Sequence, residues 1–265
     1  MHRTLLGLVL AALLLALSGC ASPPAPASEA GWRALAPGVW HRAWSPWPGS
    51  EVQALRVDLA RARLTLSPPA EAGQAVDAMP SGAGAVASVN ASFFDAAFRP
   101  RGLTVSGGQP WPELLPQARP TRDPVLACTT RCVIRLDPPA QPDPAWQLAV
   151  SGTPWLVRDG QARSPQDDDT CAALCARTHP RTAVGLDASG RHLLLLLAAG
   201  RRGEVAGLTL AQTAALLRDL GAEQAFNLDG GGSSTLLIGG RSSLPRPFNE
   251  PALRRVANAL HLFSP

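Results

Sequence analysis

The residues with the clearest chemical potential lie in the segment Asn227-Leu-Asp-Gly-Gly-Gly-Ser-Ser-Thr235. An apolar run there ends in an amide and a carboxylate, and three glycines then allow the backbone to turn sharply and approach a ligand closely. Backbone N–H groups and serine hydroxyls of such a turn can bind a phosphate or a developing oxyanion. The alternative is a plain glycine-rich hairpin loop, which the neighbouring Asp229 disfavours. The predicted binding residues are Gly230, Gly231, Gly232, Ser233 and Ser234.

This glycine segment does not resemble a nucleotide-binding loop. It lacks the lysine of a P-loop and the helix that should follow one. Asp229 is therefore interpreted as a candidate catalytic carboxylate, with a turn-capping aspartate as the alternative. Asp95 and Glu113 are the further candidates for this carboxylate and are called the reserve carboxylates below.

Asparagine is rare in the chain, and its positions are informative. Three of the four asparagines lie within apolar, strand-like runs or at their ends, where a solvated amide is not expected. A polar pocket lined by these amides explains their placement, whereas Asn249 lies between prolines and fits a turn. The predicted substrate-binding asparagines are Asn90, Asn227 and Asn258.

Arg181 follows His179-Pro180 and leads into the apolar run Thr182-Ala-Val-Gly185. An arginine at the start of a buried strand is either part of a salt bridge at the edge of the sheet or a bidentate clamp for an anion. From the residues alone the salt bridge is the favoured interpretation, with the anion clamp as the alternative. A lone His179 is typical of a loop histidine.

Most of the elements that must position these residues are predicted to be short strands bounded by Gly, Pro or Asp. The runs 182–186 and 192–197 flank Asp187-Ala-Ser-Gly190 and predict a hairpin, and the unbroken leucines 193–197 predict a strand buried on both faces. One helix is predicted at about 208–220, because Thr209-Leu-Ala-Gln212 has the form of a capping box and Gly221 supplies a stop. The expected fold class is α+β, with a mixed β-rich sheet and one packed helix in a single domain, residues 32–265.

The first residues predict export. His2 and Arg3 precede an uncharged apolar run, 5–17, which is too short to span a bilayer and has the flanks of a signal peptide. Residues 17–20, Leu-Ser-Gly-Cys, resemble the lipobox of bacterial lipoproteins, in which Cys20 is lipidated after removal of a signal peptide, here 1–19. An ordinary secretory signal is the alternative. Residues 20–31 are then a Pro/Ala-rich tether. We expect a lipid-anchored envelope protein, at the outer membrane or in the periplasm rather than at the inner membrane.

Four further cysteines form two pairs, each four residues apart. An even number in an exported chain predicts disulfides, and local pairing is expected, although three pairings are possible. A four-cysteine zinc site is the alternative, disfavoured by the loose spacing. The cysteines are Cys128, Cys132, Cys171 and Cys175.

Composition excludes little. All positive charges behind the net charge of +4 are arginines, since the chain has no lysine, and this charge is compatible with an anionic substrate or a membrane surface. No dense arginine run with an adjacent aromatic platform exists, so nucleic-acid binding is not predicted. No metal or other cofactor is predicted; the run Asp167-Asp-Asp169 has calcium binding as an alternative, with a solvated acidic loop preferred.

Several motifs, taken in order, resemble the phosphodiester glycosidase family over roughly residues 50–263. They are Asn90-Ala-Ser-Phe-Phe94, Ser151-Gly-Thr-Pro-Trp-Leu-Val-Arg-Asp-Gly160, Arg181-Thr-Ala-Val-Gly185, Gly207-Leu-Thr-Leu210, Asn227-Leu-Asp-Gly-Gly-Gly-Ser-Ser234 and Arg255-Val-Ala-Asn-Ala-Leu260. Arg254-Arg255 stands where many relatives have arginine and proline, and the two cysteine pairs are not part of the family pattern.

The resemblance implies cleavage between an anomeric carbon and a phosphodiester oxygen of a carbohydrate. A phosphate leaves readily, so the site must chiefly hold the anion and stabilise an oxocarbenium-like transition state. Asp229 and Arg181 are the expected catalytic residues. A non-catalytic glycan- or peptidoglycan-binding lipoprotein, and a hydrolase acting on another bond, remain the alternatives.

Overall fold

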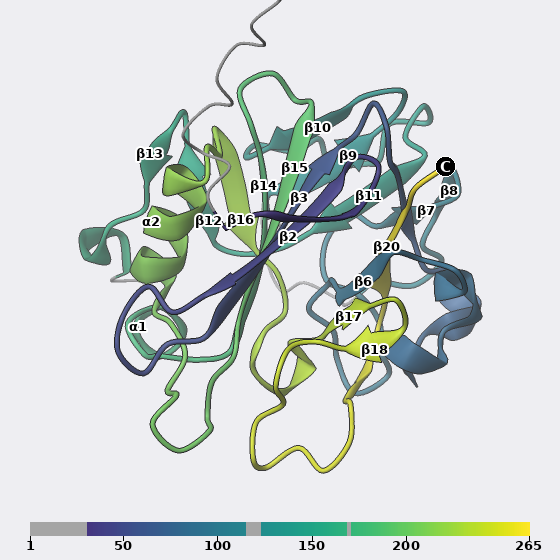
Figure 1. Ribbon diagram of the computed structural model, residues 1–265. Helices are drawn as coiled ribbons and strands as arrows, with labels where there is room; N and C mark the ends of the chain where they lie inside the picture. Colours follow the sequence, from purple (N-terminus) through teal and green to yellow (C-terminus); the bar gives the residue numbers. More distant parts are fainter. Residues whose placement is uncertain (1–30, 115–122, 169–170) are drawn as a thin grey trace, which may run out of the picture. The chain divides into compact units, whose positions relative to one another are not determined.

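The leucine-rich strand lies inside an eight-stranded antiparallel sheet. The computed structural model describes residues 31–114, 123–168 and 171–265 (Figure 1). Leu193–Leu197 are at most 2% exposed, which confirms a strand buried on both faces. The predicted hairpin is also present, with Leu186 opposite Leu193. In spatial order the sheet contains β1 (Arg33–Ala36), β2 (Val39–Trp44), β3 (Val52–Asp58), β15 (His192–Ala198), β14 (Arg181–Leu186), β16 (Gln224–Asn227), β12 (Trp155–Arg158) and β13 (Gln161–Ala162).

The predicted helix is α2 (Leu210–Asp219), and it covers one face of this sheet (Figure 1). Thr209 accepts a hydrogen bond from the Gln212 N–H, while the Gln212 side chain accepts one from the Thr209 N–H, so the predicted capping box is formed. Its buried residues, including Leu210 and Leu217, pack against leucines of β15. A second helix, α1 (Ala172–Cys175), is a single turn.

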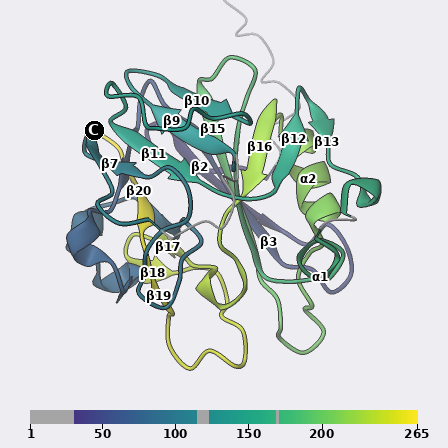
Figure 2. The ribbon, with the colours of Figure 1, turned by 180° about the vertical axis from the view of Figure 1, so that it is seen from behind.

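Two five-stranded sheets and a short ribbon complete the fold, as seen from the other side in Figure 2. The first contains β10 (Cys132–Arg135), β9 (Val125–Cys128), β11 (Leu148–Ser151), β7 (Val105–Ser106) and β8 (Gln109–Pro110). The second contains β18 (Arg241–Ser242), β17 (Leu236–Ile238), β6 (Ala87–Asn90), β20 (Ala259–Phe263) and β4 (Arg63–Leu66). The ribbon pairs β19 (Arg255–Val256) with β5 (Gln74–Ala75). Short 3₁₀ turns are η2 (Pro69–Glu71), η3 (Val76–Ala78), η4 (Pro80–Gly82), η5 (Pro165–Asp168) and η6 (Gly231–Ser233).

The main hydrophobic core lies between the three large sheets. It joins Leu195 of the eight-stranded sheet, Leu126 of the first five-stranded sheet and Leu260 of the second. Residues 31–265 therefore form one compact unit. The fold is mostly β-sheet with one multi-turn helix. The expectation of a mixed sheet was wrong, since every strand pairing within the described residues is antiparallel. Parallel pairing needs a crossover between strands that become neighbours, whereas the α2 connection joins β15 to β16, which β14 separates in the sheet.

The signal peptide, Cys20 and the tether up to residue 30 lie outside the described residues. Within 31–114, 123–168 and 171–265, no helix has the length and apolar character that crossing a membrane requires.

Candidate active site

The glycine loop bridges the eight-stranded sheet and the β6 sheet. At its start the Leu228 N–H donates to Thr182 O, at 2.8 Å, and the Asp229 N–H donates to Ala91 O, at 3.0 Å. Gly231 adopts a left-handed backbone with φ of 61°, and a Cβ on Gly230 would lie 2.7 Å from Pro180 O. The glycines are thus needed for the turn and for its close contact with the Pro180 backbone.

The glycine run does not form the amide nest that was predicted. The Gly231 N–H donates to Pro180 O, and the N–H groups of Ser233 and Ser234 donate to Gly230 O and Gly231 O. The Gly230 N–H and the Ser233 hydroxyl instead hydrogen-bond the Asp229 carboxylate. The loop therefore uses most of its donors to shape itself and to hold one carboxylate, and an anion bound there must find its donors elsewhere.

Asp229 is the chemical centre of this loop. It lines a cavity of about 200 Å³ and is the single carboxylic acid among the described residues that do so. Burial of the carboxyl raises its pKa from 3.8 to about 6, against the lowering effects of the Ser233 hydrogen bond, the Arg254 charge and the Gly230 N–H. A carboxyl with this pKa changes protonation close to neutral pH, as acid–base and nucleophilic residues of hydrolases do.

Two arginines that were not predicted supply positive charge to the cavity. Arg201 projects beside Gly231, where an added Cβ would be 3.4 Å from the guanidinium nitrogens. Its Nη2 lies 3.0 Å from His179 Nδ1. Arg254 forms an ion pair with Glu250 and lies close enough to Asp229 to lower its pKa. The cavity is lined by Phe93, Leu174, His179, Pro180, Arg181, Arg201, Asn227, Asp229, Gly230, Gly231, Gly232 and Arg254.

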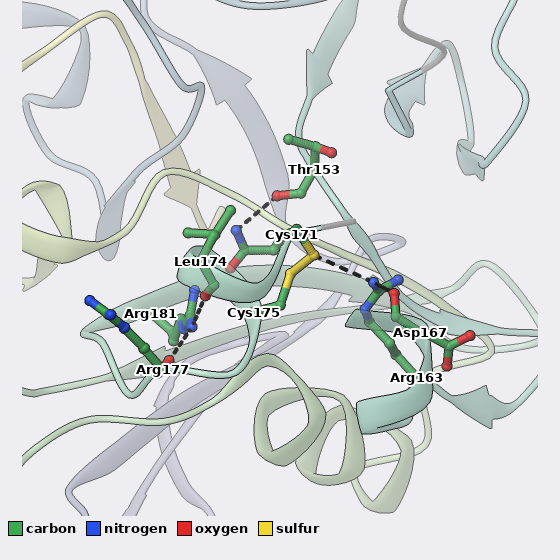
Figure 3. Close-up of a disulfide and its surroundings, with 9 residues drawn as sticks. Thr153, Arg163, Asp167, Cys171, Leu174, Cys175, Arg177 and Arg181 are labelled. Atoms are coloured by element: carbon green, nitrogen blue, oxygen red, sulfur yellow. Dashed lines mark hydrogen bonds between the residues drawn. A yellow bond between two sulfur atoms is a disulfide. The ribbon is translucent and has the colours of Figure 1, made fainter. Parts of the chain in front are cut away.

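Arg181 also lines the cavity, but the residue is only 2% exposed and its guanidinium is bonded to the protein. Its Nε donates to Leu208 O at 2.9 Å, and its Nη2 donates to Leu174 O at 2.6 Å and to Arg177 O at 2.9 Å. Figure 3 shows Arg181 directed at the turn that carries Leu174. These bonds fit a side chain that positions the cavity wall better than one that clamps a substrate anion.

Both disulfides have the expected local pairing. Cys128–Cys132 closes the β9–β10 hairpin, and Cys171–Cys175 spans the α1 turn near Arg181 (Figure 3). The second bridge therefore braces the turn whose carbonyl groups Arg181 binds, next to the cavity.

The predicted asparagines have different surroundings. Both polar side-chain atoms of Asn90 have protein partners: its Nδ2 donates to Asp229 O, at 2.6 Å, and its Oδ1 accepts from Thr182 Oγ1 and Thr235 N. It therefore ties the glycine loop to both sheets rather than facing a ligand. Asn227 lines the cavity, and Asn258 is buried beside Ser92. Thr182 Oγ1 also lies 3.4 Å from Ser234 Oγ, so the hydroxyl of that predicted ligand faces the protein.

The reserve carboxylates are not in this cavity. Asp95 forms an ion pair with Arg99, at 2.6 Å, and Glu113 is exposed. Asp167 accepts hydrogen bonds from the Ser164 N–H and hydroxyl, while Asp169 of the calcium alternative lies outside the described residues.

These features define a β-rich domain with a buried, near-neutral carboxylate and flanking arginines in one cavity. A phosphodiester glycosidase family model matches residues 83–263, which is more than half of the chain, and the chain belongs to this family. The family suggested by the sequence motifs is thereby confirmed.

Two curated relatives are similar over parts of the chain. N-acetylglucosamine-1-phosphodiester alpha-N-acetylglucosaminidase of Mus musculus is 35% identical over 101 residues, which are 34% of this chain and 19% of the mouse protein. An uncharacterized prophage-derived protein, YomE of Bacillus subtilis, is 37% identical over 87 residues, 33% of this chain and 13% of that protein. The match spans about a fifth of the mouse protein.

Solved structures share the fold. The zebrafish N-acetylglucosamine-1-phosphodiester alpha-N-acetylglucosaminidase catalytic domain, auto-inhibited by its pro-peptide, superimposes with a TM-score of 0.69 at 18% identity, covering 88% of this chain and 86% of that one. A putative exported protein of Burkholderia pseudomallei gives a TM-score of 0.61 at 18% identity, covering 81% and 74%.

Proposed function

We propose that this protein is a hydrolase that cleaves the bond between a sugar's anomeric carbon and a phosphodiester oxygen. The observation that carries the proposal is the buried Asp229 carboxyl, with a pKa of about 6, in a cavity that also holds the guanidinium groups of Arg201 and Arg254. The arginines attract and orient the phosphodiester anion. The carboxylate stabilises the positive charge that develops on the sugar ring.

The reaction needs little proton donation to the leaving group. The anomeric C–O bond breaks, its electron pair goes to the phosphate oxygen, and a phosphomonoester leaves. Water adds to the anomeric carbon and loses a proton, so the products are a free sugar and a phosphomonoester. Asp229 either forms a covalent glycosyl intermediate or acts as the base for water, and retention or inversion at the anomeric carbon distinguishes these two roles. Arg181 is assigned a positioning role at the cavity wall.

We further propose a lipid-anchored enzyme of the bacterial envelope, acting on an envelope or extracellular glycan. The predicted N-terminal signal and the lipobox-like residues that end in Cys20 support this location. Mass spectrometry of the mature protein, looking for an acylated Cys20 at its N-terminus, tests the anchoring.

The function is tested by incubating the protein with a panel of sugar-1-phosphodiesters and identifying the products. We expect free sugar and a phosphomonoester, with kcat reduced about 10³-fold in Asp229→Asn because the charge that stabilises the transition state is lost. Asp95→Asn is the matched control and should retain activity. Release of a sugar phosphate would show cleavage of the other ester bond, and binding without turnover would indicate a glycan-binding protein.

A further inference from the structure

The three arginines that line the Asp229 cavity differ in how their charge is compensated. Arg181 is buried and donates to three backbone carbonyl groups, while Arg254 forms an ion pair with the Glu250 carboxylate. Arg201 is exposed, and in the part of the chain that the structure describes no carboxylate forms an ion pair with it. Arg201 therefore brings a positive charge to the cavity wall that no paired carboxylate neutralises.

The backbone of Arg201 has a conformation that residues other than glycine seldom adopt. Its φ is 55°, in the left-handed region. The Phe248 N–H donates to Arg201 O at 3.2 Å, and directly after it Arg202 and Val205 exchange two backbone hydrogen bonds, at 3.0 and 2.8 Å. Of the three non-glycine residues with positive φ among those described, Arg201 is the one that lines the cavity. Such outliers are often found at functional sites, so the conformation supports a role for this side chain.

His179 binds the guanidinium of Arg201. Arg201 Nη2 lies 3.0 Å from His179 Nδ1, and both residues line the cavity. Because guanidinium N–H groups only donate, Nδ1 must carry a lone pair, so the imidazole in this contact is neutral. Two backbone hydrogen bonds to Leu208, at 3.1 and 2.9 Å, fix His179 directly before Pro180 and β14. His179 therefore presents an acceptor at a defined place on the cavity wall.

A neutral acceptor orients the arginine without cancelling its charge. A carboxylate in the same place would also hold the guanidinium, but it would compete with a substrate anion, as Glu250 does at Arg254. The imidazole occupies one of the five N–H donors of Arg201, and the donors that remain can bind phosphoryl oxygens in a bidentate manner. The guanidinium also lies next to the catalytic loop, since a Cβ on Gly231 would be 3.4 Å from its Nη1 and Nη2.

We propose that His179 is a positioning residue that holds Arg201 as the principal ligand of the substrate's phosphoryl group. Arg254, which is already paired with Glu250, attracts the same anion more weakly. This inference rests on the proposed function, because it names the main anion ligand of that site and the side chain that orients it. His179 acts through Arg201, so its contribution depends on the acceptor at Nδ1.

The test compares three replacements of His179 by steady-state kinetics on a sugar-1-phosphodiester. His179→Leu removes the acceptor, and we expect it to raise KM about tenfold with kcat changed less, since hydrogen bonds to charged groups have energies of this order. His179→Asn places its side-chain oxygen near the position of Nδ1 and should restore a KM close to that of the wild type. His179→Gln places its oxygen near the position of Nε2 and should not restore it. All three variants keep the backbone bonds to Leu208, so their melting temperatures should be alike.

A double-mutant cycle shows whether His179 acts through Arg201. Arg201→Gln should raise KM about a hundredfold, because a charged ligand of the anion is lost, and adding His179→Leu should raise it little further. Arg202→Gln is the matched control, since it removes the same charge one residue along, where the guanidinium pairs with Glu51 and lies over the Phe248 ring. Its KM should stay near that of the wild type. Additive effects of His179→Leu and Arg201→Gln would overturn the inference, and so would equal effects of Arg201→Gln and Arg202→Gln.

The inference and the proposed function can fail separately. If the wild type is active but His179→Leu and His179→Asn have the same KM, the Nδ1 acceptor does not position Arg201, while the activity stands. If the wild type cleaves no sugar phosphodiester, an NMR titration with dimethyl phosphate decides. Binding that His179→Leu weakens and His179→Asn restores supports the positioning role. Binding that is absent, or equal in the wild type and both variants, overturns it.

Discussion

Two buried polar regions of the molecule contrast sharply. In the cavity of Asp229, the Asn227 Oδ1 atom has no hydrogen-bond partner among the described residues, and burial raises the pKa of the Asp229 carboxyl to about 6. Ser88 lies on β6, two residues before Asn90. It belongs to a second network, in which the side chains of Ser88, His261, Ser81 and Glu71 are hydrogen-bonded to one another. Ser88 Oγ lies 2.8 Å from His261 Nδ1, and Ser81 Oγ lies 3.1 Å from His261 Nε2 and donates to Glu71 at 2.5 Å.

The network can be assigned proton by proton. Because the Ser81 hydroxyl donates its proton to the Glu71 carboxylate, it accepts from His261 Nε2, which leaves His261 Nδ1 to accept from Ser88. A satisfied buried network of this kind stabilises and specifies the fold. An incompletely bonded region keeps a free-energy cost that a ligand can relieve. The difference teaches that a site is distinguished from a core by its missing partners, not by its polarity.

The strongest test of this contrast compares Asp229→Asn with Glu71→Gln. Burial holds the pKa of Asp229 at about 6 instead of 3.8, so the ionised form costs the fold on the order of 3 kcal/mol at neutral pH. Asp229→Asn should therefore raise the free energy of unfolding at pH 7.5, and Glu71→Gln should lower it by about 2 kcal/mol, because Ser81 loses a charged acceptor. Urea denaturation measures both.

The raised pKa of Asp229 also determines how the stability of the fold changes with pH. The folded state binds a proton more tightly than the unfolded state, so stability falls as pH rises from about 4 to about 6 and stays lower above it. The gain from Asp229→Asn should vanish at pH 3.5, where the carboxyl is protonated in both states. Equal effects at pH 3.5 and pH 7.5 would show that the carboxyl is not desolvated. Activity should change only in Asp229→Asn, since Glu71 is outside the cavity.

A smaller effect is expected from Arg254→Gln. The Arg254 charge lowers the pKa of Asp229, so removing it should shift the acidic limb of the kcat/KM profile to higher pH. With weaker attraction for the phosphate, we expect kcat/KM at pH 6 to fall about tenfold. Arg218→Gln is a suitable control, because Arg218 pairs with Asp219 at the surface of α2. If the acidic limb does not move, the Arg254 charge does not influence the protonation of Asp229.

Sequence patterns predicted the framework of the site better than its bonding. The glycine turn after Leu228 and the capped helix were readable because glycine and capping residues have local conformational signatures. Arg201 was missed because Gly200-Arg-Arg-Gly203 looks like a solvated loop, although two arginines soon after a buried strand were a usable signal. Arg254 was named only as the first member of the pair Arg254-Arg255, in which Arg255 departs from the proline of the family pattern.

The roles of the predicted polar residues could not be derived from spacing. Asn90, Asn227 and Asn258 share the same sequence setting, yet only the three-dimensional structure shows that both polar side-chain atoms of Asn90 have partners, whereas Asn227 Oδ1 and Asn258 Nδ2 have none among the described residues. The same holds for Arg181, whose carbonyl partners come from the α1 turn and Leu208. Partners distant in sequence decide whether a polar side chain holds the fold or faces a substrate.

The smallest expected effect concerns how the His261 network stabilises the fold at different pH values. Its pH dependence has the opposite sign to that of Asp229. Burial lowers the pKa of His261 below 6.5, partly opposed by Glu71, so the folded state binds the proton less tightly than the unfolded state. Stability from this region is present above pH 6.5 and is lost as pH falls, the opposite of Asp229. We expect the advantage of the wild type over His261→Gln in free energy of unfolding to shrink between pH 7.5 and pH 5. Both proteins contain Asp229, so its contribution cancels in the difference. A difference that stays constant over this range would mean that His261 titrates alike in the folded and unfolded chain, and the His261 network would then not exclude the charged form.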